Sequence, residues 1–151
     1  MLTTLIISGC SMCYELIISA VSSYLLGNST LQYSITIGLY MAALGFGSYI
    51  SKYFKKNLFH VFVTIELSIG VVGGVSSLLL FLSNIYISNY AAVMYAEILL
   101  IGTLAGAEIP IMTRIIEADE NNLSVTLSSI FSFDYIGGLL GSIAFPLLLL
   151  P

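Results

Sequence analysis

The stretch Ile101-Gly-Thr-Leu-Ala-Gly-Ala-Glu-Ile-Pro-Ile-Met-Thr-Arg114 decides the class of fold. It lies within an apolar run from about Tyr90 to Ile116, which is long enough to cross a bilayer. This run nevertheless carries Glu97 and Glu108. A carboxylate at the centre of a membrane costs on the order of 2.5–3.5 kcal/mol on insertion scales, so a lipid-facing position is disfavoured. The run therefore predicts a membrane helix whose polar face turns toward other helices.

Spacing within this helix favours a cation-attracting inner face. Glu97 and Glu108 are eleven residues apart, which places them on one face and roughly 16 Å apart along the axis. Gly102 and Gly106 form a GxxxG step that allows close approach of another helix. Pro110 lacks an N–H group, so the carbonyl of Gly106 is released from its helical hydrogen bond beside Glu108.

The composition predicts an all-α, polytopic membrane helix bundle of about five transmembrane helices. The chain has 151 residues, of which 58% are hydrophobic and 8% charged, and such values exclude an ordinary soluble domain. We expect one transmembrane domain over residues 1–151 and no soluble catalytic domain. The expected spans are about 2–26, 31–50, 58–82, 90–116 and 124–150.

Carboxylates also occur in the other apolar runs, each on a face with small or hydroxyl side chains. The groups are Glu15 within a stripe of serines, Glu66 above Gly70 and Gly74, and Asp134 above Gly137 and Gly141. Small residues at this spacing are typical of helix packing in membranes. We therefore expect these glycines, together with Gly102, Gly106 and Pro110, to shape helix contacts.

The basic residues predict the orientation. Three lysines and His60 lie between the second and third runs, and Arg114 ends the fourth. By the positive-inside rule both connections and the N-terminus are cytoplasmic, in a multi-pass protein of the cell membrane whose first partner is the lipid bilayer. In this orientation Glu66, Glu108 and Asp134 lie roughly 10–14 Å from the cytoplasmic face, with Glu15 near mid-membrane.

We therefore predict an intramembrane site that binds an organic polycation, a proton or a sodium ion. Burial and mutual repulsion of carboxylates favour holding a cation or a proton. The alternative is internal neutralisation by hydrogen bonds to serines, tyrosines and Arg114. The candidate ligands are Glu15, Glu66, Glu108 and Asp134, with Glu97 in the outer half, Tyr14 and Tyr135 next to acids, and Gln32 at the start of the second run.

Other chemistry is not indicated. Cys10 and Cys13 have CxxC spacing, but no second pair or nearby histidine completes a metal site. Neither a nucleophile triad nor a glycine-rich phosphate loop is present, and no basic surface suggests nucleic acid. We expect no catalytic residue, no metal and no cofactor within these residues.

Several motifs, taken in order, resemble the membrane-embedded N-terminal domain of integral membrane spermidine-synthase-like proteins, the polyamine aminopropyltransferases. The resemblance covers nearly the whole chain. The matching stretches are Tyr14-Glu-Leu16, Ser23-Tyr-Leu-Leu-Gly-Asn-Ser29, Gln32-Tyr-Ser34, Ile37-Gly-Leu39, Gly45-Phe-Gly-Ser48, Ile65-Glu66 with Gly70 and Gly73-Gly74, Ile101 to Pro110 with Arg114, and Phe133-Asp-Tyr135 with Gly137, Gly141-Ser142 and Phe145-Pro146.

The resemblance implies a ligand rather than an activity. In that family a soluble synthase domain transfers an aminopropyl group from decarboxylated S-adenosylmethionine to putrescine. These 151 residues do not contain that domain, so we expect them to be non-catalytic, with the cofactor belonging to the synthase domain. A synthase domain or further transmembrane helices are the expected partners, and a polyamine is the expected ligand.

Two other functions remain open. The basic connection after Gly47, with Ser51-Lys52 and Lys55-Lys56, loosely resembles the loop of major-facilitator transporters, although the usual acid and loop glycine are replaced by Ser51 and Phe54. The chain would then be a half-transporter. Alternatively, it is a membrane scaffold for a separately encoded synthase.

Overall fold

The structure, a computed structural model, is built from helices. It describes residues 2–86, 90–120 and 123–149, with only the backbone of 118–120 and 149. Over these ranges the predicted all-α class with five long helices is confirmed. The elements are α1 (Leu2–Leu26), α2 (Ser29–Ile50), the 3-10 turn η1 (Ser51–Tyr53), α3 (Leu58–Tyr86), α4 (Tyr90–Glu120), α5 (Leu123–Ala144) and the π-helical turn η2 (Phe145–Leu149).

Several helix ends differ from the apolar runs, among them the end of α3, which continues four residues past 82 to Tyr86. Asn28, in the left-handed conformation at φ 47°, caps α2 by accepting from the Leu31 amide at 3.3 Å. α4 continues past Ile116 to Glu120, because charge ends an apolar run but does not break helical hydrogen bonding. The fifth run changes from α to π geometry at Phe145, next to Pro146, which cannot donate to the helix. Residue 150, the expected end of that run, lies outside the described residues.

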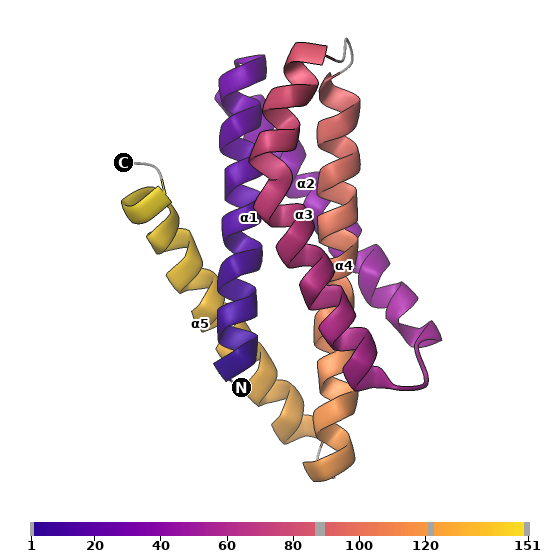
Figure 1. The fold of residues 1–151 in the computed structure, drawn as a ribbon. Helices are drawn as coiled ribbons and strands as arrows, with labels where there is room; N and C mark the ends of the chain where they lie inside the picture. Colours follow the sequence, from indigo (N-terminus) through magenta and orange to yellow (C-terminus); the bar gives the residue numbers. More distant parts are fainter. Residues whose placement is uncertain (1, 87–89, 121–122, 150–151) are drawn as a thin grey trace.

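The helices run alternately up and down, so α2 and α4 are parallel and α1 is antiparallel to α4 (Figure 1). α4 contacts each of the other four long helices. α5 leans away from the bundle and packs mainly on α1 (Figure 1). Each long helix is of sufficient length and hydropathy to cross a membrane. α4 is thus the central element of the fold.

Glycines set the close contacts of α4 with α2 and of α5 with α1. A Cβ atom at Gly102 would lie 2.7 Å from the Cβ of Ala43, and one at Gly106 would overlap the backbone of Leu44. On the other side of the bundle, Gly137 and Gly141 pack against the backbone of α1. These two helix pairs approach closely because no side chain separates their backbones.

The expected packing role of Gly70 and Gly74 is wrong. Both glycines are exposed, and a Cβ atom at either would meet nothing within 4 Å among the described residues. Gly73 takes the role instead, since a Cβ atom there would lie 2.8 Å from ring atoms of Tyr14. The stripe below Glu66 therefore faces outward, and the neighbouring face of α3 contacts α1.

Arg114 joins the connection between α2 and α3 to α4. Its Nη1 donates to the carbonyl of Phe54 at 2.8 Å and its Nη2 to that of Ser51 at 2.7 Å. Its Nε donates to the carbonyl of Pro110 at 3.1 Å, within a helix that continues through the proline. Arg114 thus bonds to backbone carbonyls, and these bonds do not neutralise the buried acids.

Candidate cation site

Two hydroxyl–thioether hydrogen bonds determine how α1 and α4 align. The Thr4 hydroxyl donates to Sδ of Met112 at 2.9 Å, and the Ser22 hydroxyl donates to Sδ of Met94 at 2.6 Å. The two bonds are eighteen residues apart on each helix, which is five full turns, so they lie on one face of each. In this antiparallel alignment, each α1 residue between the two bonds lies at the same height along the helix axis, or level, as one residue of α4.

Glu108 and Asp134 lie at the level of Ser8. Ser8 is four residues after Thr4 on α1, and Glu108 is four residues before Met112 on α4. Because the two helices are antiparallel, Ser8 lies opposite Glu108. The Ser8 hydroxyl also donates to the backbone carbonyl of Asp134 at 2.6 Å, which brings α5 to the same level. Glu108 and Asp134 therefore lie at one level of the bundle.

Glu66 of α3 lies at nearly the same level. α3 runs parallel to α1 (Figure 1), and Gly73 packs against Tyr14. Glu66 is seven residues before Gly73 on α3, and Ile7 is seven residues before Tyr14 on α1. Glu66 therefore lies at the level of Ile7, one residue from that of Ser8. Glu66 and Asp134 are also close enough to act electrostatically on Glu108. We call Glu66, Glu108 and Asp134 the acid layer.

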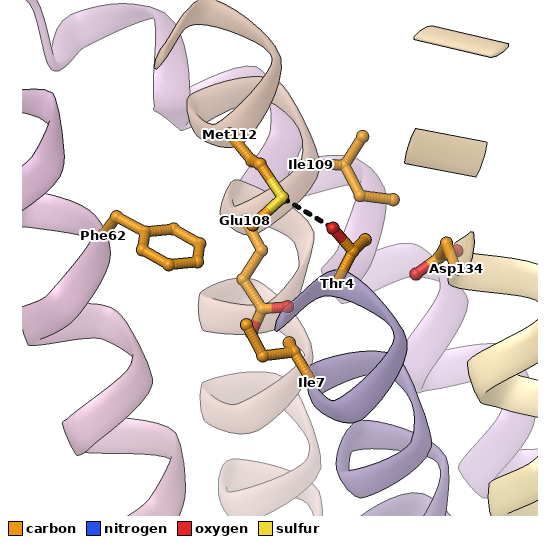
Figure 2. A pocket seen from close by; sticks show the side chains of 7 residues that line it. All are labelled: Thr4, Ile7, Phe62, Glu108, Ile109, Met112 and Asp134. Carbon is orange, nitrogen blue, oxygen red and sulfur yellow. Dashed lines mark hydrogen bonds between the residues drawn. The ribbon is translucent and has the colours of Figure 1, made fainter. Parts of the chain in front are cut away.

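A small cavity lies within the acid layer. Its volume is about 10 Å³, which admits one water-sized group. Figure 2 shows Glu108 and Asp134 on either side of Thr4, with Phe62 on the far side of Glu108. The lining residues are Thr4, Ile7, Phe62, Glu108, Ile109, Met112 and Asp134.

Two carboxylate oxygens of the acid layer are buried without a hydrogen bond. Glu108 is 8% exposed, and no donor among the described residues reaches its Oε1 or the Oε1 of Glu66. Buried polar atoms of proteins nearly always have a partner. A proton, a water molecule or a cationic group would supply the partner that these two oxygens lack.

Glu15 lies outside the acid layer. It is seven residues above Ser8, or about 10 Å along α1, and is buried. Tyr40 of α2 connects the two levels: its hydroxyl is 2.6 Å from the Ser11 hydroxyl, and it interacts electrostatically with Glu15 and with the acids below. The predicted convergence of four acids is therefore a layer of three with Glu15 above.

Tyr40 was missed by the reasoning from sequence. It is 4% exposed, and its hydroxyl pairs with that of Ser11 and lies within electrostatic range of Glu108 and Asp134 on other helices. A signal was present, since Gln32, Thr36 and Tyr40 recur every four residues and all three are buried. Ten tyrosines in the chain obscured it, because interfacial anchoring explains most tyrosines in membrane helices.

The remaining candidates are separate from the acid layer. Tyr14 is half-buried and interacts with Glu66. Tyr135 is 71% exposed and stacks on Phe131 with ring centroids 6.1 Å apart, so it does not contribute to the cavity. Gln32 is buried but lies two turns from Tyr40, toward the other end of α2. Glu97 is level with Ser19, about 16 Å from Glu108 along α4.

The acids of the layer are not arranged as a metal centre. Among residues 2–86, 90–120 and 123–149, no three His, Cys, Asp or Glu side chains are grouped closely enough to hold a metal ion. The layer therefore presents separate carboxylates within electrostatic range of one another. Such an arrangement suits protons or a cation with more than one charged group.

Known proteins share this region. The chain is 43% identical over 150 residues to the polyamine aminopropyltransferase of Leptospira interrogans and 41% identical over 152 residues to polyamine aminopropyltransferase 2 of Ralstonia nicotianae. Each alignment covers 99% of this chain. The chain matches the N-terminal region of polyamine aminopropyltransferases.

The match to polyamine aminopropyltransferases concerns one part of those proteins. The chain spans about 30% of the length of the curated relatives it matches. Polyamine aminopropyltransferase 1 of Streptomyces coelicolor is 36% identical over 152 residues, 29% of its length. No protein-family model and no solved structure matches the chain. The family resemblance inferred from the motifs is thus confirmed for this region.

Proposed function

We propose that this chain is the membrane-embedded part of a polyamine aminopropyltransferase, and that its acid layer binds one positively charged group of a polyamine. The relatives' names supply the ligand class. The carrying observation is the acid layer itself, in which Glu66 and Asp134 lie near buried Glu108, whose Oε1 has no donor among the described residues.

Membrane embedding is supported by where the apolar side chains lie. Large apolar side chains cover the outer faces of the helices, and Leu67 and Val71 of α3 are each 66% exposed. A continuous exposed apolar surface of this kind is stable against lipid and unstable in water. The lysines are confined to residues 52–56, and this bias orients the N-terminus toward the cytoplasm of a multi-pass protein in the cell membrane.

The charge balance supports a cationic ligand. Carboxylates in a low-dielectric interior need a proton or a positive partner. Arg114, the one arginine in the sequence, directs its guanidinium to the carbonyls of Ser51, Phe54 and Pro110. The positive charge must therefore come from a proton or a ligand.

The size of the cavity limits how a polyamine binds. A volume of about 10 Å³ accepts one group the size of a water molecule, such as a terminal ammonium. An ammonium donates three hydrogen bonds, enough to reach Glu108 and the adjacent acids. The rest of the polyamine would lie between helices, toward half-buried Glu66 or Asp134.

Spermidine binding by the purified chain tests this function. In equilibrium dialysis we expect saturable binding by the wild type, weakened at least tenfold in Glu108→Gln and Asp134→Asn, the loss of about one charged contact. Glu117→Gln is the matched control, because Glu117 lies on the same helix but lines a different groove. Equal binding by all four proteins would refute the proposed site.

A further inference from the structure

Buried and half-buried polar side chains line the contact between α1 and α4. Apart from Tyr90, which lies one turn beyond Met94, they lie from the Thr4–Met112 bond to the Ser22–Met94 bond, which are about 27 Å apart along the helices. That length approaches the thickness of a membrane's hydrocarbon core. The α1 members are Thr4, Ser8, Ser11, Glu15, Ser19 and Ser22, and the α4 members are Tyr90, Glu97 and Glu108. We call this set the polar seam.

The oxygen-bearing groups of the polar seam follow one another in short steps. From the acid layer at Ser8 the next level is the Ser11–Tyr40 pair, about 4.5 Å higher. Glu15 is about 6 Å beyond that pair, and the level of Ser19 and Glu97 is about 6 Å beyond Glu15. One water molecule bridges two oxygens about 5.5 Å apart. The axial rise of each step, about 4.5–6 Å, is therefore close to the span of one bridging water molecule.

Glu97 is the decisive group, because neither of its oxygens is paired. It is 6% exposed, and no donor among the described residues reaches Oε1 or Oε2. Tyr90, two turns before Glu97 and the first residue of α4, interacts electrostatically with Glu97, and its hydroxyl also has no hydrogen-bond partner within the described chain. The Ser22 hydroxyl lies beside that of Tyr90.

Helix α2 contributes a further hydroxyl close to these levels. Tyr40 packs against Gly102, and α2 runs parallel to α4 (Figure 1). Thr36 is one turn earlier, at about the level of Ile98, next to Glu97. Its hydroxyl is fully buried and has no partner among the described residues. Unpaired groups thus lie at both ends of the seam, at Glu108 in the acid layer and at Thr36, Tyr90 and Glu97 toward the other end.

We propose that the polar seam is a proton pathway between the acid layer and the Tyr90 end of the bundle. Glu108 is the group at one end, Glu15 the central relay and Glu97 the relay near the other end. The charged or titratable groups that face the seam are those of the acid layer and the tyrosines at positions 14, 40 and 90. No described lysine or arginine bonds to it.

Each transfer conserves atoms and charge. A protonated carboxyl breaks its O–H bond to a bridging water or hydroxyl, and that group passes a different proton to the next carboxylate. The donor is left as a carboxylate and the acceptor becomes a carboxylic acid, so one proton moves in one direction and one negative charge in the other. Carboxyl groups suit this exchange because they both donate and accept.

The pathway shares Glu108 with the proposed polyamine site but does not require a polyamine. Glu97 lies about 16 Å from Glu108. Glu97→Gln should therefore abolish proton movement and leave spermidine binding unchanged. Conversely, absence of spermidine binding with intact proton movement would refute the proposed function alone.

Proton flux into vesicles tests the pathway. The purified chain is reconstituted in phosphatidylcholine vesicles with a trapped pH indicator, and an acid pulse is applied with potassium and valinomycin to balance charge. We expect the wild type and Glu117→Gln to acidify the interior faster than empty vesicles, and Glu97→Gln and Glu15→Gln to lose that excess. No excess flux in the wild type, or equal flux in all variants, would overturn the proposal.

Infrared spectroscopy gives a second measurement that requires no variant to fold. If the seam exchanges protons with bulk solvent, the carboxylic C=O band of the wild type shifts when the sample is moved into D₂O. A protonated-carboxyl band that fails to shift would refute the pathway. Assignment then uses Glu97→Gln, which should remove part of the band, with Glu117→Gln as the unchanged control.

Discussion

The close contact of α2 with α4 makes a quantitative prediction about two glycines. A Cβ atom at Gly47 would overlap the carbonyl of Thr103, and backbone cannot give way as a flexible side chain does. A Cβ atom at Gly45 would meet nothing within 4 Å in the described structure. Both residues lie inside α2. The substitutions Gly47→Ala and Gly45→Ala therefore add the same methyl group, at Gly47 against packed backbone and at Gly45 in open space.

The magnitude follows from two terms. Replacing glycine by alanine inside a helix contributes about 1 kcal/mol of stability from backbone entropy. Forcing an extra methyl group into a packed contact costs about 1–3 kcal/mol. Gly45→Ala should thus be neutral or stabilising by up to about 1 kcal/mol. Gly47→Ala should lower the free energy of unfolding, so the two variants differ by about 1–3 kcal/mol.

The assay is unfolding of the purified chain in mixed micelles by increasing mole fraction of sodium dodecyl sulfate. Circular dichroism follows the helices, and tyrosine fluorescence follows packing, since the chain has ten tyrosines and no tryptophan. Gly106→Ala, against the Leu44 backbone, should behave like Gly47→Ala. Equal stability of the Gly45 and Gly47 variants would refute the packing of α2 against α4.

Three more predictions follow from single side chains. Arg114→Met removes two charged hydrogen bonds to the α2–α3 connection, each worth about 1.5–3 kcal/mol. Limited proteolysis of that connection should therefore be faster in Arg114→Met than in the wild type, and unchanged in the control Lys56→Met. Equal cleavage rates in the two variants would contradict this role of Arg114. Tyr40→Phe removes the hydrogen bond to Ser11 and should lower the free energy of unfolding by about 1 kcal/mol. The control Tyr135→Phe, at an exposed position, should not change it, and both variants are measured in the same detergent unfolding assay. A cysteine at Lys55 should react with an impermeant maleimide from the cytoplasmic side of the membrane and not from the other, and the opposite labelling would overturn the orientation.

The sequence alone determined the class of fold and the kinds of residue at its centre. Apolar length and the scarcity of charge predicted five long helices, because the cost of burying a charge or a free backbone group acts on each segment separately. For the same reason Glu108 was identified as an inward-facing acid beside a GxxxG step. A carboxylate in an apolar run predicts by itself that its helix face turns away from lipid, whichever helix packs against that face.

The tertiary structure alone decided which side chains meet. Gly74 and Gly73 are adjacent in sequence, yet Gly73 packs against Tyr14 and Gly74 is exposed. Likewise, Glu15 separates from the acid layer because the Thr4 and Ser22 bonds to methionines align α1 with α4. Hydropathy is a property of one segment, whereas the level at which two helices meet depends on packing summed over both surfaces. No single stretch of sequence contains that sum.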